Sequence, residues 1–204
     1  MNVRPILYSA LTSLVLASFS THLYAHKEGD FILRAGAISL QPEEQPFGTL
    51  DTLNAGLGNN EQLGITFSYM LNENWAFGLL AATPFKHDIT SNGAKIGETK
   101  LLPPTFSLEF FPAKASSKWQ PYFGAGLNYT TFFSEESTLG DIKFEDSFGL
   151  ALEMGLDYRI NDHMVVNASI WNIDVDTDAT LNGADIGGVN IDPWAYMISI
   201  GYIF

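Results

Sequence analysis

The sequence has 204 residues and a formal net charge of −13, with hydrophobic residues at 46% and aromatic residues at 13%. This acidity argues against nucleic acid as a partner, and the lack of cysteine is compatible with export through an oxidising compartment. After the amino-terminal region, no stretch approaches the ~20 continuous apolar residues of a membrane-spanning helix. If the protein lives in a membrane, it must therefore do so as a β-barrel.

Residues 1–25 have the form of a cleaved secretory signal peptide. Arg4 supplies a positive charge, Ile6–Phe19 is mostly apolar, and Thr21–Ala25 is a short polar tail that ends in a small residue. We predict cleavage after Ala25, which leaves residues 26–204 as the folded domain. The alternative is an anchor helix, but the apolar run is short and contains several hydroxyl side chains.

Eight later segments alternate between large apolar and small or polar side chains with a period of two. They are Phe31–Leu40, Gln62–Leu71, Trp75–Thr83, Lys100–Phe111, Gln120–Phe133, Ser147–Ile160, Met164–Asp174 and Trp194–Phe204. In the last of these the apolar face carries aromatic residues at both ends, and the chain stops on Phe204. Such strands are typical of a wall with lipid on one side and a lumen on the other, with aromatic rings at both interfaces.

The connections alternate between short and long, which fixes the orientation. The short ones are Asn72–Asn74, Pro112–Trp119 and Asn161–His163, and the long ones are Gln41–Glu61, Pro84–Thr99, Ser134–Asp146 and Val175–Asp192. The predicted fold is all-β: an eight-stranded antiparallel transmembrane β-barrel with short periplasmic turns and longer external loops. The alternative, a soluble lipocalin-like carrier, would expose charged residues, whereas here the charged strand residues lie opposite the continuous apolar face.

The inward-facing residues differ with height. The predicted lower lumen carries charges that should pair and plug a narrow barrel, namely Arg34, Glu109, Glu153, Asp157 and Arg159. Higher up, the inward residues are apolar, namely Leu80, Ala82, Trp171 and Ile173. An apolar pocket that is open outside and sealed below indicates a hydrophobic ligand.

Prolines suggest a lateral exit. Pro103 and Pro104 lie within the fourth predicted strand, and Pro84 lies at the top of the third. Proline cannot donate to a β-ladder, so it marks an edge or a gap. We hypothesise a lateral seam here, through which an apolar molecule enters the bilayer. The alternative is that these prolines only end the pairing above the membrane.

Several stretches resemble the OmpW family of bacterial outer-membrane proteins across nearly the whole predicted mature chain. They are Phe31–Gly36, Gln62–Met70, Leu80–Phe85, Leu102–Thr105, Pro121–Phe133, Asn167–Trp171 and Ile191–Trp194. The resemblance implies an eight-stranded outer-membrane barrel with a hydrophobic lumen, implicated in the passage of small hydrophobic molecules and related to the alkane-uptake protein AlkL. It also implies that the apolar constriction is carried by Leu80 and Trp171.

Two further motifs point to other chemistries. His87 and Asp88 lie together in a predicted external loop, but one such pair is more typical of a solvated loop than of a catalytic site. The segment Asp174–Asp178, with Asn182 and Asp185, has calcium-like spacing, but Ala179 occupies the position where an EF-hand requires glycine. We therefore predict no enzyme activity, no cofactor and no metal site.

The sequence thus predicts an outer-membrane channel for small hydrophobic solutes. Its expected partners are outer-membrane lipid, lipopolysaccharide and the solutes themselves. The alternative is a structural or surface-interaction barrel with a closed lumen, whose loops act as a receptor for phage, bacteriocin or host.

Overall fold

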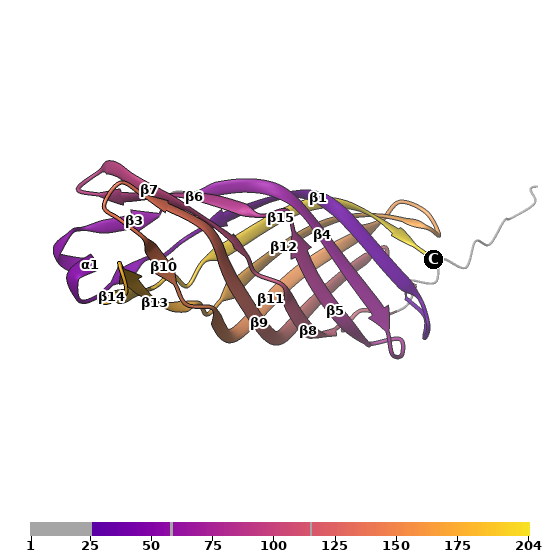
Figure 1. Cartoon of the computed structure of the whole chain (residues 1–204). Coiled ribbons are helices and arrows are strands. Elements are labelled where there is room, and N and C mark those ends of the chain that lie inside the picture. The colour runs from indigo at the N-terminus through magenta and orange to yellow at the C-terminus, as the bar shows by residue number, and fades with distance from the viewer. Residues whose placement is uncertain (1–25, 58, 115) are drawn as a thin grey trace, which may run out of the picture.

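A computed structural model describes residues 26–57, 59–114 and 116–204, and the predicted signal peptide lies outside these ranges. The chain forms one elongated barrel of tilted strands (Figure 1). The eight strands of the barrel wall are β1 (Phe31–Gln41), β4 (Asn60–Met70), β5 (Trp75–Ala82), β8 (Thr105–Phe110), β9 (Trp119–Ser137), β11 (Ser147–Arg159), β12 (Met164–Ile173) and β15 (Trp194–Ile203).

Antiparallel pairing closes these strands into a ring. The hydrogen-bonded order is β11-β12-β15-β1-β4-β5-β8-β9, and the pairing of β9 with β11 completes the circle. The first and last wall strands are paired through ten residues, from Ile32 opposite Ile203 to Gln41 opposite Trp194. The predicted eight-stranded antiparallel barrel is therefore confirmed, and closure removes the unpaired edges that lipid could not solvate.

The outer face of the wall is a continuous apolar surface. Its most exposed side chains include Ile198 at 70% and Leu150 at 65%, values that suit contact with lipid rather than with water. Aromatic pairs mark the periplasmic end, with Trp75 against Phe110 and Trp119 against Tyr158 at centroid distances of 4.8 and 4.6 Å. These rings form the interfacial girdle expected of such barrels.

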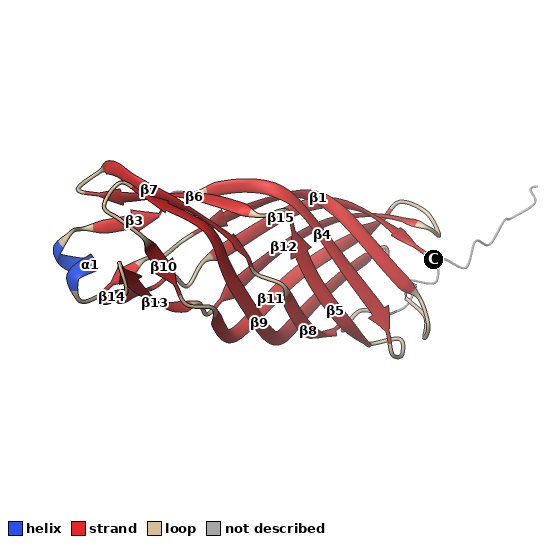
Figure 2. Cartoon of the chain, viewed as in Figure 1, coloured by secondary structure: helices blue, strands red, loops and turns tan. Residues whose placement is uncertain are grey.

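The external connections are more ordered than the sequence predicted. They contain β2 (Gln45–Pro46), α1 (Thr49–Thr52), β3 (Ala55–Leu57), β6 (Phe85–Ser91), β7 (Ala94–Leu102), β10 (Ile142–Phe144), β13 (Asp176–Leu181) and β14 (Ala184–Asn190). Figure 2 shows these elements extending the barrel beyond its wall. Among the described residues, no helix is long and apolar enough to cross a membrane.

One predicted strand is in fact two. The segment Lys100–Phe111 was expected to be continuous, but β7 ends at Leu102 and β8 begins at Thr105. The two intervening residues are prolines, which lack the N–H that a ladder needs. The break lets β7 leave β5 and pair instead with β6 and β9 above the wall.

Candidate functional site in the barrel lumen

The interior consists of three layers along the barrel axis. Buried apolar residues fill the external part, a polar network crosses the middle, and a second apolar cluster closes the periplasmic end. The external cluster comprises Ile38, Leu40, Leu80, Phe85, Leu101, Phe132, Ala151, Trp171, Ile173, Val175, Val189, Ile191, Ala195 and Met197. The periplasmic cluster comprises Ile32, Met70, Ala76, Phe111, Tyr122, Val165 and Ile203.

Three of the four residues predicted for the apolar lumen are fully buried in the external cluster. Leu80 is 5% exposed, Trp171 2% and Ile173 0%. Ala82 is half-buried and packs against this cluster from the end of β5. These side chains point inward because successive residues on β5 and β12 face opposite sides of the wall, and their neighbours along the strand face lipid.

The external hairpins supply much of the same cluster, although their sequence segments were expected to be loops. Phe85 on β6, Leu101 on β7 and Val189 on β14 came from segments expected to be loops or strand ends. Their period-two spacing, as in Phe85, His87 and Ile89, was the signal that would have revealed strands. The apolar lumen thus continues above the membrane wall.

Two narrow, largely apolar cavities lie within this region. One is bounded by Leu50 of α1 together with Ile89, Phe132 and Phe144. The other is bounded by Leu40, Leu101, Pro103 and Ile191, so it reaches the inner side of the break between β7 and β8.

His87 is one of the lining residues of the second cavity. It is 1% exposed, which corrects the expectation of a solvated His87–Asp88 pair. Because neighbours on a strand point to opposite faces, Asp88 faces outward, where its carboxylate lies 2.6 Å from Lys95 Nζ. The two side chains cannot act together.

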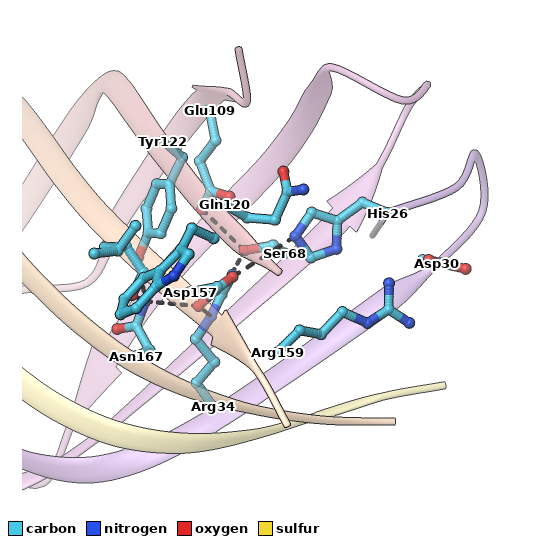
Figure 3. A network of polar contacts seen from close by, with 12 residues as sticks. His26, Asp30, Arg34, Ser68, Glu109, Gln120, Tyr122, Asp157, Arg159 and Asn167 are labelled. Atoms are coloured by element: carbon cyan, nitrogen blue, oxygen red, sulfur yellow. Dashed lines mark hydrogen bonds and ion pairs between the residues drawn. The ribbon is translucent and has the colours of Figure 1, made fainter. Parts of the chain in front are cut away.

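The polar network has an ion pair at its centre. Arg34 Nε and Nη2 donate to the two carboxylate oxygens of Asp157 at 3.0 and 2.5 Å. Asn167 Nδ2 donates to the same carboxylate at 2.8 Å, and the Arg34 guanidinium lies 5.3 Å from the centroid of the Tyr122 ring. These residues lie on four different strands and meet inside the barrel (Figure 3).

The two glutamates of the network are held by uncharged donors rather than by direct ion pairs. Ser68 Oγ donates to Glu109 at 3.0 Å and Ser107 Oγ donates to Glu153 at 2.8 Å. Trp171 Nε1 donates to the other oxygen of Glu153 at 2.5 Å. The expectation that all the lumen charges pair with one another is therefore wrong, because carboxylates outnumber the guanidinium available to them. The Trp171 bond also joins the polar network to the apolar layer above.

A glycine makes room for each glutamate. A Cβ on Gly78 would lie 2.2 Å from Glu109 Oε1, and a Cβ on Gly124 would lie 2.2 Å from Glu153 Oε1. Such contacts are too short for real atoms, so any side chain here would displace the carboxylates. The small residues of the alternating pattern therefore form the space that the network fills.

Arg159 is buried, at 4% exposed, and lies at the periplasmic end of β11. Its guanidinium donates to the carbonyl oxygens of Asn161 and Asp162 in the β11–β12 turn at 3.2 and 2.8 Å. Figure 3 shows it extending away from Asp157. It stabilises a periplasmic turn.

His26 occupies the periplasmic entrance instead. Its side chain is 1% exposed, with Nε2 3.7 Å from Asp157 and the ring 4.8 Å from that of Phe111. Burial lowers the pKa of His26 to about 4, and the nearby Arg34 and Arg159 guanidinium groups add to the lowering against the opposing charge of Asp157. The imidazole is therefore neutral at pH 7.

The segment with calcium-like spacing lies partly on a strand. Asp176 and Asp178 lie on β13, while Asn182 and Asp185 bond to backbone N–H groups of Asp141 and Gly187. The carboxylates that approach within 4.8 Å are those of Asp174, Asp176 and Asp192. Burial, followed by the charge of Asp174, raises the pKa of Asp176.

Comparison with known proteins identifies the family. Residues 27–204 match the model of the OmpW family. The chain is 45% identical to outer membrane protein W of Vibrio cholerae over 93% of this chain and 96% of that protein. The chain belongs to the OmpW family. Outer membrane protein W of Escherichia coli K12 is 42% identical over 99% of this chain and the whole of that protein. The OmpW-family barrel described here is thus a protein of the bacterial outer membrane.

Solved structures agree with this fold. The crystal structure of OprG from Pseudomonas aeruginosa superposes with a TM-score of 0.80 at 38% identity, covering 88% of this chain and 98% of that one. The solid-state NMR structure of outer membrane protein AlkL superposes with a TM-score of 0.68 at 18% identity, covering 100% of this chain and 97% of that one. The second likeness concerns the fold alone.

Proposed function

We propose that this OmpW-family barrel admits small hydrophobic molecules through its external apolar lumen and releases them sideways into the bilayer. The observation that carries the proposal is the layering of the interior, with an apolar region toward the outside and a buried ion-paired network beneath it. A solute that enters from outside meets apolar side chains first and cannot continue straight through without breaking that network.

Entry has a simple driving force. Apolar surface that leaves water gains roughly 25 cal/mol per Å2, and Leu80, Trp171 and Ile173, with Ala82 beside them, would supply the contacts. Transfer from this lumen to lipid then costs little, because the bilayer interior is equally apolar. The proposal involves no covalent chemistry and no energy source beyond the concentration gradient.

The break at the prolines supports a lateral exit. Pairing between β5 and β8 ends with Leu80 opposite Thr105, and pairing between β6 and β7 begins with Phe85 opposite Leu101. No ladder pair joins the intervening residues, 81–84 and 102–104, in the described structure. The carbonyl of Pro104 instead accepts from Tyr129 N on β9 at 3.1 Å. The wall beside the cavity at Pro103 therefore lacks β5–β8 hydrogen bonds.

A disulfide across this break tests the exit. Ala81→Cys with Pro104→Cys continues the register of Leu80 opposite Thr105, and the sequence contains no other cysteine to interfere. We expect the oxidised pair to lower uptake of an aromatic hydrocarbon such as naphthalene by at least tenfold, and reduction to restore it.

The matched control locks a fully paired part of the wall. Leu127 and Leu150 lie directly opposite each other on β9 and β11 and face lipid. Their cysteine pair should leave uptake unchanged in both redox states. Unchanged uptake by the oxidised Ala81–Pro104 pair would remove the lateral exit from the proposal, whereas the apolar lumen would still be tested by the Leu80 substitution described in the Discussion.

A further inference from the structure

The outward face of the β6–β7 hairpin carries two lysines side by side. Lys86 and Lys100 are direct cross-strand partners, so their side chains leave the same face. Their strand neighbours His87 and Thr99 are each 1% exposed and point into the barrel. The two lysines therefore point away from the lumen, toward whatever surrounds the hairpin.

Their height places them at the boundary of the lipid. Along β8 and β7 the outward residues are Phe110, Leu108, Phe106, Leu102 and then Lys100. Ten residues at ~3.4 Å each, tilted by ~40°, rise about 26 Å above the aromatic girdle at Phe110. The apolar band of such barrels is ~25 Å tall. Lys100, and Lys86 beside it, lie where the lipid head groups of the outer leaflet begin.

The hairpin neutralises this pair only in part, because its three lysines face two carboxylates, Asp88 and Glu98. Glu98 contacts Lys86 Nζ at 2.7 Å but is shared with Lys95 at 3.0 Å, and Asp88 contacts Lys95 at 2.6 Å. These ammonium groups, Lys86 first, lower the pKa of Glu98, which remains charged. No ion pair of Lys100 is found among the described residues. Two like charges directly opposite each other destabilise a hairpin unless an anion lies between them.

The positive charge of Lys86 and Lys100 also differs from the charge of the segments around them. The external segments are rich in Asp and Glu, and their four lysines are Lys86, Lys95, Lys100 and Lys143. Lys95 is held between Asp88 and Glu98 at the hairpin tip, and Lys143 lies 3.6 Å from both Glu135 and Asp141. On the neighbouring wall strand β4, the residue above the lipid-facing Leu63 is Glu61. Positive charge at the head-group level is thus concentrated on one side of the barrel.

We propose that Lys86 and Lys100 together bind a phosphate group of lipid A in the outer leaflet. A lipid A phosphate is a compact anion at the height of these ammonium groups, and it can accept charge-assisted hydrogen bonds from both. Binding would offset the repulsion between the lysines and fix which side of the barrel faces a lipopolysaccharide molecule. The site is independent of solute passage.

Titration of the LPS-free protein with purified Kdo2-lipid A tests the site. The full mature chain is refolded in detergent with EDTA present, so that divalent ions cannot bridge the lipid to carboxylates, and bound lipid is counted by native mass spectrometry. We expect Lys86→Gln with Lys100→Gln to weaken binding roughly tenfold or more. Arginine at both positions should retain binding.

The matched control removes the same amount of charge elsewhere. Lys95→Gln with Lys143→Gln also loses two external lysines, and its affinity should stay within twofold of the parent. Dephosphorylated lipid A should bind the parent protein as weakly as Kdo2-lipid A binds the double glutamine variant. The proposal would be overturned if the Lys86→Gln, Lys100→Gln variant bound Kdo2-lipid A as tightly as the parent. It would also be overturned if the control variant lost as much affinity, or if removing the phosphates left the affinity of the parent unchanged. If the double variant does not give the heat-modifiable folded band, Lys100→Gln alone replaces it, since no ion pair of this lysine is found within residues 26–57, 59–114 and 116–204.

Discussion

The external and the central parts of the lumen are closed in physically different ways. In the external part, aliphatic side chains and phenylalanines of the hairpins and the wall meet without directional bonds, so they can separate without leaving a polar group unpaired. Trp171, which donates to Glu153, is the exception. In the centre, Arg34 and Asp157 depend on each other across 123 residues of sequence, and separating them would leave a buried charge without a partner. This difference supports the proposal that the external part admits a solute while the centre remains shut.

The largest expected effect comes from breaking the central ion pair. Arg34→Met should lower the free energy of unfolding by about 3–5 kcal/mol, because Asp157 would stay buried without its partner. Urea titration followed by the heat-modifiable gel shift measures this. Adding Asp157→Leu should recover much of the loss. A double variant as unstable as the single one would show that the unpaired Asp157 carboxylate is not the cause of the loss.

Acid should weaken the periplasmic end next. The pKa of His26 is about 4 in the folded protein and 6.5 ordinarily, so between these values the unfolded chain binds a proton that the folded chain does not. The free energy of unfolding should therefore fall by on the order of 3 kcal/mol as the pH drops from 6.5 to 4. Below pH 4, His26 should cause no further loss of stability. His26→Phe should flatten this part of the profile. If the unfolding free energy of His26→Phe depended on pH as steeply as that of the parent, His26 would not be the group responsible.

Filling the glycine space tests how tightly the centre is packed. Gly124→Ala places a methyl group 2.2 Å from the resting position of Glu153 Oε1, and we expect a loss of about 1–3 kcal/mol in unfolding free energy. Glu153→Asp in the same chain should restore part of it, because the shorter side chain leaves room. Normal stability in Gly124→Ala would mean that Glu153 has another place to lie.

The clearest change in uptake should come from making the constriction polar. Leu80→Gln makes the constriction polar and should cost about 1–3 kcal/mol of unfolding free energy, because the amide enters an apolar cluster. It should reduce naphthalene uptake severalfold in protein that gives the folded band. Leu139→Gln, at an exposed external position, is the matched control and should transport normally. Normal uptake by Leu80→Gln would favour a surface-interaction barrel, in which binding through the loops persists whatever the lumen contains.

Much of the wall could be predicted because the orientation of each side chain is set by its position along its own strand. Each strand residue meets either lipid or lumen, so the period of two in Trp194–Phe204 or Gln62–Leu71 carries the orientation within the sequence itself. The external hairpins were harder because residues such as His87 and Val189 are buried by one another rather than by a bilayer. The roles of Leu80 and Trp171 in passage remain predictions for the uptake experiment.

The sequence alone therefore determined the family, the outer-membrane location and the eight-stranded antiparallel barrel, since all three follow from alternation and from residues matched along the chain. Only the tertiary structure decided what the interior residues contact. In it, Trp171 donates to Glu153, and Arg159 donates to the carbonyl of Asn161 in the β11–β12 turn. His26 lies 3.7 Å from Asp157, and Lys86 is the cross-strand partner of Lys100. These contacts depend on the register and closure of strands far apart in sequence, which no local pattern specifies.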